Sequence, residues 1–348
     1  MMRVVFVPTV SNPYQYVLAE ALEDLGIEVE QRARLPSEAW LVRNRGRVQL
    51  VHMHWLHPLY GSGQHFSPLR LARFVEKLIL ARSLGYKIFW TVHNVLPHER
   101  TFPLLDLLAR FSAAALTDAI IVHCEYARSE VSKRFSRKKS IHVIPHGHYA
   151  STYLHSVSRE EARRALNIAA DTFVYLFFGK IRPYKGVEQL MTAFKQLDGH
   201  DAELFIAGEC QSEEGKISLL QMAQGNSHIR IYPEFVPSER VQQFFAAADV
   251  LVAPYLQVLT SGSVVLGLSL GLPVIAPAQG CLPELITPEV GILYDPLDEE
   301  ALQRALQSIR DCDVGTMGRE AYRLSRAPHF DWKSIARKTF DAYRECRV

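Results

Sequence analysis

Short apolar runs recur along the chain, and stretches of ten or more residues with helical periodicity separate most of them. Strands that alternate with helices in this way are typical of parallel sheets covered by helices on both faces. The pattern stops once and then restarts, so it predicts an α/β chain of two doubly wound units in series. The expected strands are 4–8, 48–55, 87–93 and 119–125 in the first unit, and 173–179, 202–208, 228–233, 250–255 and 272–277 in the second.

The break between the two patterns lies at 144–156, where strand signal gives way to Gly, His, Ser and Tyr residues before a helical pattern at 158–166. A chain of 348 residues also fits two domains of about 150 to 170 residues better than one. We therefore expect one Rossmann-like domain over 1–155 and a second over 156–327. Helices are expected at 185–197 and 238–248 in the second domain.

Composition narrows the class of protein. With 48% hydrophobic and 22% charged residues, the chain is typical of a globular protein. It has no apolar run of about 18 residues that would predict a membrane span, and its first ten residues indicate a strand more than a signal peptide. The five cysteines lack CxxC spacing, which favours reduced thiols and a cytoplasmic location over a zinc site or a disulfide framework.

Charge is unevenly distributed along the chain. Residues 1–150 hold 19 Lys/Arg against 12 Asp/Glu, whereas the remainder holds 20 against 25. Basic residues are densest at 133–139, a segment that fits either an anionic surface or a solvated helix end. The segment 101–116 is rich in leucine and phenylalanine, which fits either a helix lying on a bilayer or ordinary core packing. A peripheral position at the inner face of the cell membrane is thus one expectation.

Polar side chains follow successive strands of the first unit. Ligands bind outside the carboxyl ends of the strands in open parallel sheets, so this clustering predicts a polar site. Taken singly, each histidine also fits a structural role. The residues are His52, His54 and His57 after one strand, His93, Asn94, His98 and Glu99 after the next, His123 and Glu125 after a third, and His146 and His148 at the join.

Close histidines raise the question of a metal site. The HMHWLH segment at 52–57 places three imidazoles within six residues. No cysteine or carboxylate is spaced to complete a tetrahedral set around them, so we expect neither a metal nor another cofactor.

The segment VYLFFGKIRPYKGV at 174–187 indicates a strand that ends in a cationic turn before a helix. A glycine followed by a helix amino terminus presents free N–H groups and a partial positive charge, which suits a diphosphate. Lys180 and Lys185 add two full charges, and ammonium groups neutralise phosphate oxygens without demanding planar geometry. The alternative is an ordinary strand-to-helix turn whose lysines point into water.

A second turn of this kind follows the strand at 250–255. Thr260, Ser261, Gly262 and Ser263 stand directly before the apolar helix expected at 264–270, so that hydroxyl groups and amides meet at one helix start. We expect them, with Gly179, to hold a phosphate, although a single serine cap would also explain one of them. Glu284 follows the next strand, where it could accept hydrogen bonds from sugar hydroxyls or cap a helix.

These segments together resemble glycosyltransferases of the GT-B fold, most clearly the large family four and its relatives. GKIRPYKG (179–186) resembles the donor-phosphate motif of that family, with Lys180 in the place of an arginine, and WTVHN (90–94) resembles the motif whose histidine approaches the donor sugar, here His93. IPHGHY (144–149) resembles the segment before the crossing between domains, and the segment 261–277 resembles the helix and strand beside the donor. DWKSIARKTFDAYREC (331–346) resembles the last helix, which in this fold returns to the first domain.

The chain departs from that family in two places. Two glutamates eight positions apart normally flank the donor, and the aligned residues here are Val258 and Leu266. The amino-terminal glycine loop is replaced by PTVSNPYQ (8–15), so Ser11, Asn12 and Tyr14 would serve the acceptor or phosphate edge. With HNVLPHE (93–99), IPHGHY (144–149) and TSGS (260–263) in place of the glutamate pair, the chain looks closer to inverting β-mannosyltransferases of bacterial exopolysaccharide assembly.

The resemblance implies a GT-B architecture of two Rossmann-like domains facing a cleft, the first with helix 328–348 binding the acceptor and the second binding the nucleotide sugar. It implies a metal-independent transfer from a nucleotide-diphosphate sugar, best matched by GDP-mannose, to a saccharide or a polyprenyl-diphosphate-linked acceptor. A membrane surface is a further expected partner, and nucleic acid is not. The base candidates are His93, Glu125 and Glu99, and the acceptor-side candidates are Ser11, Asn12, Tyr14, His54, His98 and His148.

Other functions fit parts of the pattern. A retaining transferase that uses a UDP-sugar and a sugar-nucleotide epimerase would share the diphosphate site. A binding protein that keeps the fold without its chemistry is a third alternative, favoured by the missing glutamates. A dehydrogenase is excluded because no GxGxxG follows the first strand.

Overall fold

The computed structural model describes residues 2–10, 12–61, 67–96, 102–153, 156–197 and 201–346. The chain divides into two compact units: unit 1 comprises Met1–Gly147 with Pro328–Val348, and unit 2 comprises His148–Ala327. The sequence-based boundaries were 155/156 and 327/328. The first therefore lies eight residues beyond the division at Gly147, and the second coincides with it.

Unit 1 is built on a six-stranded sheet in which every pairing is parallel, in the order β2-β1-β3-β4-β5-β6. The central strands β1, β3, β4 and β5 are almost completely buried, as expected for a parallel sheet covered on both faces. The bounds are β1 Arg3–Val7, β2 Glu28–Gln31, β3 Leu50–Met53, β4 Lys87–Thr91, β5 Ala119–Val122 and β6 Ile141–Val143.

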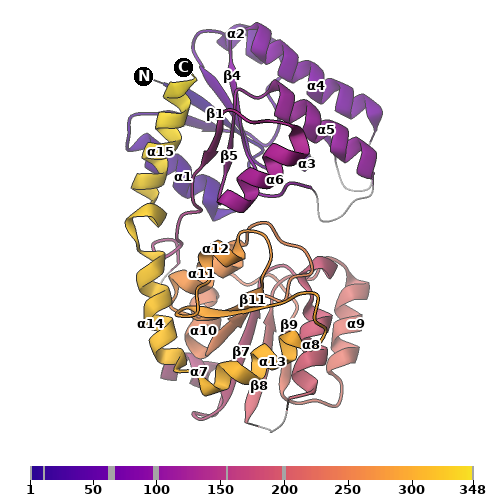
Figure 1. Cartoon of the computed structure of the whole chain (residues 1–348), viewed down its shortest axis with the longest axis vertical. Coiled ribbons are helices and arrows are strands. Elements are labelled where there is room, and N and C mark those ends of the chain that lie inside the picture. The colour runs from indigo at the N-terminus through magenta and orange to yellow at the C-terminus, as the bar shows by residue number, and fades with distance from the viewer. Residues whose placement is uncertain are drawn as a thin grey trace. The chain divides into compact units, whose positions relative to one another are not determined.

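Helices cover both faces of this sheet (Figure 1). On one face α1 packs against α15, the C-terminal helix, which therefore belongs to unit 1 as the sequence resemblance implied. On the other face α5 packs against both α4 and α6. The bounds are α1 Pro13–Glu23, α2 Glu38–Asn44, α3 His57–Tyr60, α4 Pro68–Ser83, α5 Pro103–Leu116, α6 Glu125–Phe135 and α15 Trp332–Glu345.

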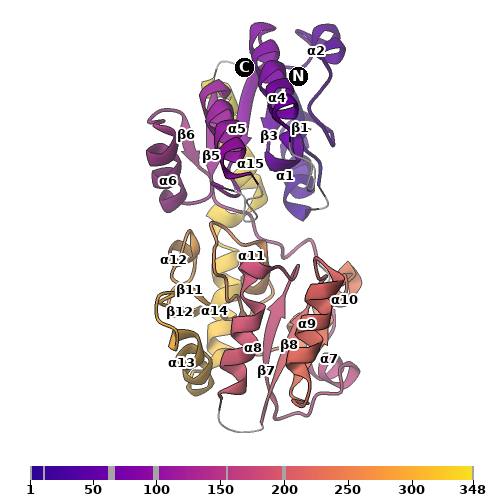
Figure 2. The same cartoon turned by 90° about the vertical axis from the view of Figure 1, so that its right-hand side faces the viewer.

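Unit 2 repeats the design with a second parallel six-stranded sheet, in the order β12-β11-β10-β7-β8-β9. Figure 2 shows α8 and α9 side by side along this unit, and they pack against each other. The strands are β7 Phe173–Phe178, β8 Ala202–Ala207, β9 Ile229–Tyr232, β10 Val250–Val252, β11 Val274–Pro277 and β12 Gly291–Tyr294. The helices are α7 Arg159–Ala165, α8 Val187–Lys195, α9 Glu213–Ala223, α10 Ser238–Ala247, α11 Gly262–Ser269, α12 Leu282–Leu285, α13 Ala301–Ser308 and α14 Val314–Ser325, with short 3₁₀ turns at Pro183–Lys185, Ile309–Asp311 and, in unit 1, Pro328–Phe330.

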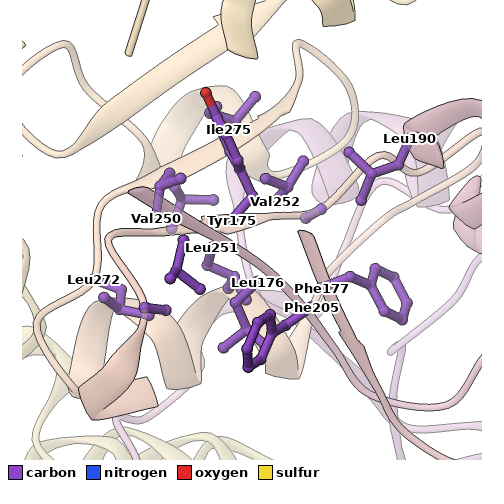
Figure 3. Packing of buried hydrophobic residues seen from close by; sticks show 14 of the residues in the cluster. Tyr175, Leu176, Phe177, Leu190, Phe205, Val250, Leu251, Val252, Leu272 and Ile275 are labelled. Atoms are coloured by element: carbon purple, nitrogen blue, oxygen red, sulfur yellow. The ribbon is translucent and has the colours of Figure 1, made fainter. Parts of the chain in front are cut away.

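The apolar runs of the sequence form the centre of unit 2. Tyr175, Leu176 and Phe177 of β7 are at most 1% exposed, and Figure 3 shows them packed with residues of β8, β10 and β11. The Tyr175 hydroxyl donates to the Leu306 carbonyl at 2.6 Å, so its one polar group is satisfied inside the core. Helices on both sides of the sheet bury both faces of β7, which explains why the strand is apolar throughout.

The sequence pattern missed three strands, β2, β6 and β12, and all three lie at sheet edges. Each pairs with one neighbour only, and most of their residues are half-buried or exposed. An edge strand has one flank toward solvent, so it lacks the continuous apolar run that identifies a central strand. This explains why the apolar pattern missed β2 (EVEQ) and β6 (IHV), but not β12 (GILY), which has a short apolar run.

Each sheet reverses its direction of growth at one point, which fixes where a ligand binds in such folds. In unit 1 the chain adds β2 on one side of β1 and β3 on the other. In unit 2 it adds β8 and β9 on one side of β7, and then β10, β11 and β12 on the other. The carboxyl ends of β1 and β3, and of β7 and β10, are therefore the places to search for a site.

Candidate functional site

The turn after β7 is shaped by a glycine that no other residue could replace without strain. Gly179 has a φ of 121°, and a side-chain carbon there would come within 2.8 Å of Ser263 Oγ. The backbone of the β7 turn and the start of α11 are therefore in direct contact. Lys180 follows at once, exposed, with its ammonium 3.4 Å from Glu209.

Lys185 connects the turn after β7 with the turn after β10. Its ammonium lies 4.0 Å from the centre of the Tyr255 ring, in a cation–π contact. The Tyr255 hydroxyl is 2.8 Å from Ser261 Oγ, at the cap of α11. Tyr255 thus joins the predicted lysine to the predicted hydroxyl turn. Sequence reasoning missed this residue, although an aromatic side chain just after a strand end is a usable signal.

The start of α11 is a capped helix terminus. Ser261 Oγ accepts from the amide of Val264 at 3.2 Å, and Ser261 itself is buried. The amides of Gly262 and Ser263, in the first turn, have no acceptor within the helix. Ser261 is therefore the cap, and Gly262 and Ser263 are the residues that present amides and a hydroxyl beside Gly179.

The turn after β11 is fastened to the turn after β10 by main-chain contacts. Cys281 donates its amide to the Leu259 carbonyl at 2.8 Å, and Gln279 Oε1 accepts from the Val258 amide at 3.1 Å. Gly280 has a φ of 63° and lies so close to the carbonyls of Val258 and Leu259 that a side chain would clash. Thr260 and Glu284 stand on these joined turns, Glu284 in the short helix α12.

Gly179, Lys185 and the Ser261–Ser263 turn therefore meet at the switch point of the second sheet. Such a set offers an ammonium, a hydroxyl and free amides at a helix amino terminus, all of which favour an anion. The folded backbone fixes the positions of these amides, so they need no rearrangement when a ligand binds. The arrangement suits a phosphate or a diphosphate.

The switch point of the first sheet carries a cluster of aromatic and imidazole rings instead. Tyr14 is 2% exposed and has ring contacts with four histidines and with Trp332. Trp55 stacks on His93 with ring centres 4.2 Å apart and planes inclined by 10°. We call this set the ring cluster; its members are Tyr14, His52, His54, Trp55, His93, His123, His146 and Trp332.

Hydrogen bonds order three of these histidines in one direction. His123 Nδ1 lies 2.9 Å from the Ile144 carbonyl, which can only accept, so Nδ1 carries the proton. His123 Nε2 must then accept from His93 Nδ1, and His93 Nε2 from His54 Nδ1, each over 3.4 Å. The Ile144 carbonyl thus sets the same neutral tautomer along the row, which ends at His54 Nε2, a buried acceptor for which the described residues provide no hydrogen-bond partner.

Burial keeps the ring cluster neutral. It lowers the pKa of His52 and of His146 to about 3 and that of His123 to about 4. The pKa values of His54 and His93 also fall well below the ordinary value, chiefly through desolvation and further through neighbouring imidazoles. His52 is held between Tyr343 and Thr91, each 2.7 Å away, which ties β3 to the C-terminal helix α15.

The remaining base and acceptor candidates that the structure describes each have a local hydrogen-bond or ion-pair partner. Asn12 caps α1, because its Oδ1 accepts from the Tyr14 amide at 2.9 Å. Glu125 is exposed at the start of α6 and forms an ion pair with Arg128 at 2.8 Å. His148 is the first residue of unit 2, and its Nδ1 accepts from the Ala150 amide at 3.3 Å. Ser11, His98 and Glu99 fall outside the described residues.

The described histidines are not grouped as ligands of a common metal ion. In the ranges that the structure describes, no group of three or more His, Cys, Asp or Glu residues is arranged to hold a metal ion. In the ring cluster the imidazole nitrogens face each other, a carbonyl or hydroxyl groups instead of converging on one point.

The two positions that carry glutamates in family four are apolar here. Leu266 is 4% exposed within α11, and Val258 packs at the edge of the core of unit 2. Neither supplies a carboxylate. The nearby acidic residue on these turns is Glu284.

Comparison with known proteins identifies the second unit. Residues 158–322 match the model of a family described as glycosyl transferases group 1. Over 96% of its length, the chain is 26% identical to 88% of a GDP-mannose:glycolipid 4-beta-D-mannosyltransferase of Xanthomonas campestris pv. campestris. It is 25% identical to a D-inositol 3-phosphate glycosyltransferase of Streptomyces avermitilis, covering 96% of this chain and 72% of that one.

Solved structures share the fold of the whole chain. Sucrose-phosphate synthase from Thermosynechococcus elongatus superposes with a TM-score of 0.79 at 18% identity, covering 99% of both chains. Anabaena HepE in complex with UDP-glucose gives a TM-score of 0.77 at 17% identity, covering 99% of this chain and 100% of that one. The matched family, the relatives and the shared fold together show that the chain is a glycosyltransferase of the GT-B type.

Proposed function

We propose that the chain transfers mannose from GDP-mannose to a lipid-linked or saccharide acceptor in bacterial polysaccharide assembly, without a metal ion. The observation that carries the proposal is the contact of Lys185 with Tyr255 beside the Ser261–Ser263 turn, at the switch point of the second sheet. Similarity along nearly the whole chain to a GDP-mannose:glycolipid 4-beta-D-mannosyltransferase supports the choice of donor and acceptor class.

In this proposal unit 2 holds the donor diphosphate. Lys180, Lys185 and the amides of Gly262 and Ser263 surround the phosphate oxygens, and Glu284 accepts from sugar or ribose hydroxyls. As the glycosidic bond breaks, negative charge grows on the leaving diphosphate, so fixed cations and amides stabilise the transition state more than the bound donor. Two ammonium groups supply the neutralisation that a divalent ion would otherwise supply.

The proposal favours inversion at the anomeric carbon, because Val258 and Leu266 replace the carboxylates of the retaining family pattern. Inversion needs a base that takes the proton of the acceptor hydroxyl. Glu125 has an exposed carboxylate at the carboxyl end of β5. His93 is buried, neutral and bonded through both ring nitrogens, so we assign it a positioning role and Glu125 the role of base.

The proposal includes a membrane surface as the place of reaction, since a polyprenyl-linked or glycolipid acceptor resides there. No helix in the described part of the chain is both long enough and apolar enough to cross a bilayer. In this proposal a surface of the folded chain makes the contact with the membrane.

Incubation with GDP-mannose labelled in the sugar, together with lipid extract from a polysaccharide-producing bacterium, tests the proposal. Label that moves into the lipid fraction supports it. Label that stays soluble in a sugar of changed identity indicates the epimerase, and nucleotide binding without turnover indicates a binding protein. A thermal-shift panel of GDP, UDP and ADP identifies the base, and a shift with UDP alone would overturn the choice of GDP-mannose.

A further inference from the structure

Helix α5 has its two charged side chains buried and three of its large apolar side chains exposed. Its two charged residues, Asp106 and Arg110, are 3% and 4% exposed. Asp106 Oδ1 accepts from the Tyr60 hydroxyl at 2.8 Å, so the carboxylate is satisfied inside the unit. A surface helix normally has the opposite arrangement, with charges outside and leucines inside.

The outward face of α5 is largely apolar. Leu104 is 76% exposed, Leu108 55% and Phe111 41%, at spacings of four and three residues that place them on one side of the helix. The other exposed residues of α5 are Pro103 and Ala115. Ser112, on the same side, is half-buried, and no charged side chain lies on this face of the helix. We call Leu104, Leu108 and Phe111 the α5 stripe. Ordinary core packing, the alternative that the sequence left open, does not explain it.

Basic residues border the stripe on α6, the helix beside α5 in Figures 1 and 2. The Phe111 ring packs edge-on against Phe135 at 5.2 Å, which brings the stripe next to the last turn of α6. Lys133, Lys138 and Lys139 are exposed there, and among the described residues none of the three has an acidic partner within ion-pair distance.

One charge of the 133–139 segment has a structural role. The Arg137 guanidinium donates to the carbonyls of Ala114 at 2.6 Å, Thr117 at 2.9 Å and Asp118 at 2.6 Å, at the end of α5. Arg137 therefore fixes the segment after α6, which carries Lys138 and Lys139, to the end of α5. The α5 stripe and this segment form one rigid surface.

The basic side of α6 also forms a hollow of about 570 Å³. Lysine ammonium groups and serine hydroxyls are the groups that bind a phosphate monoanion or diester in proteins. The hollow is lined by Glu125, Arg128, Ser129, Ser132, Lys133, Lys138, Ser140 and Ile141.

We propose that the α5 stripe, Lys133 of α6, and Lys138 and Lys139 of the segment after α6 form the surface by which this chain docks on an anionic phospholipid bilayer. The stripe enters the boundary between headgroups and acyl chains, and Lys133, Lys138 and Lys139 contact headgroup phosphates. Charge complementarity selects the bilayer over other apolar partners, because apolar side chains flanked by unpaired lysines match a surface of that composition. This surface adds a membrane-docking site to the proposed function. Docking can be measured by itself, and only its role in sugar transfer rests on the proposed function.

Flotation of the full chain with vesicles of phosphatidylcholine containing phosphatidylglycerol tests the inference. We expect the chain to float with these vesicles at low salt, and to do so less with pure phosphatidylcholine or at about 1 M salt, where screening shortens the Debye length to about 3 Å.

Leu104→Gln with Leu108→Gln removes the stripe at exposed positions. Burial of even one leucine contributes about a tenfold factor in binding, so we expect at least a tenfold loss at both salt concentrations. The matched control is Ile217→Gln with Leu220→Gln on α9, where the two side chains are 53% and 42% exposed in unit 2. The control pair should bind vesicles as the parent chain does.

Lys133→Gln with Lys138→Gln removes two charges and leaves Arg137 in place. Each lysine near an anionic surface contributes about fivefold to binding, so we expect a loss of about 30-fold that is confined to low salt and anionic vesicles. The matched control is Lys333→Gln with Lys338→Gln on α15, both exposed.

Two results would overturn the inference. The first is that the parent chain stays at the bottom of the gradient in the presence of anionic vesicles. The other is sedimentation showing a dimer that Leu104→Gln with Leu108→Gln dissolves, since a second copy would then be the occupant of the stripe. The thermal shift produced by GDP is measured on every variant, because it reports on the donor site in unit 2 and so separates failure of this surface from failure of the proposed function.

Discussion

The carboxyl edges of the two sheets have the same topology and opposite chemistry. Both reverse direction beside their first strand, and both gather polar residues there. In unit 1 the gathered groups are buried neutral rings, whose pKa values fall because desolvation disfavours the charged form. In unit 2 they are lysines, glycines and hydroxyls around a helix amino terminus.

This difference separates position from chemistry. The fold decides where a ligand can lie, but the residue types decide which charge is tolerated. Neutral imidazoles that are bonded to each other cannot compensate a diphosphate, whereas Lys185 and the α11 amides can. The proposal therefore gives the anion-binding role to unit 2, whereas the ring cluster of unit 1 is buried and uncharged. Four experiments test this contrast between the two units.

The largest effect on the rate of sugar transfer should come from removing the two lysine charges at the proposed diphosphate site of unit 2. Lys180→Ala with Lys185→Ala is expected to lower the rate of sugar transfer by about 10² to 10³, since fixed donors aimed at developing charge have that effect. Initial rates with labelled donor measure it, and circular dichroism checks folding. Lys195→Ala, at the far end of α8 from Lys185, is the matched control. Turnover near the parent rate in the double variant would remove the diphosphate assignment.

The next effect tests which group of unit 1 handles the proton. Glu125→Gln should lower kcat by about 10², the usual contribution of a general base. Glu130→Gln on the same helix, where Glu130 pairs with Arg134 at 3.8 Å, should leave kcat unchanged. Comparing the pH profiles of kcat for Glu125→Gln, Glu99→Gln and His93→Gln identifies the base. Loss of the basic limb only in His93→Gln would move the role to the ring cluster.

A smaller effect, on the free energy of unfolding, concerns the backbone of the turn between β7 and α8. Gly186 has a φ of 69°, and a side-chain carbon would lie 1.9 Å from the Pro254 carbonyl oxygen. Gly186→Ala should therefore lower the free energy of unfolding by about 2 to 4 kcal/mol. Gly26→Ala in unit 1, with a φ of 81° and no atom within 4 Å of the new carbon, should cost only about 1 kcal/mol. Urea unfolding followed by circular dichroism compares them, and equal losses would argue against a close contact at Gly186.

The smallest effect is a difference in pH dependence between the units. The folded pKa of His123 is about 4, below its ordinary 6.5, so the unfolded chain binds more protons between these values. Stability is then independent of this group above about pH 6.5 and falls as the pH drops toward 4, by about 1.4 kcal/mol per pH unit for each such histidine.

All four tryptophans, Trp40, Trp55, Trp90 and Trp332, lie in unit 1, so fluorescence reports on that unit. The urea midpoint followed by fluorescence should fall between pH 6.5 and 4, and His123→Asn should make this fall less steep. His228→Asn in unit 2 is the control and should leave the slope unchanged. A midpoint that does not change with pH would show that the ring cluster is already open to water.

The sequence alone determined much of the fold. Continuous apolar runs such as 174–178 can be stable only when buried on both faces, and this fixed the central strands and the doubly wound pattern. Glycines and lysines after strand ends pointed to the anion site, because the carboxyl ends of parallel strands meet at one edge. The last helix followed from resemblance, since no local pattern says which unit a helix joins.

Tertiary structure decided what depends on neighbours. The edge strands β2 and β6 are defined by pairing with one partner strand each and carry no apolar run. Tyr255 and Lys185 are 70 residues apart in the chain, so only packing could show their contact. The tautomers of the histidines depend on the Ile144 carbonyl, and the outward leucines of α5 on which of its faces the sheet covers. Composition sets which groups are available, but charge, protonation and exposure are set by the atoms that surround them.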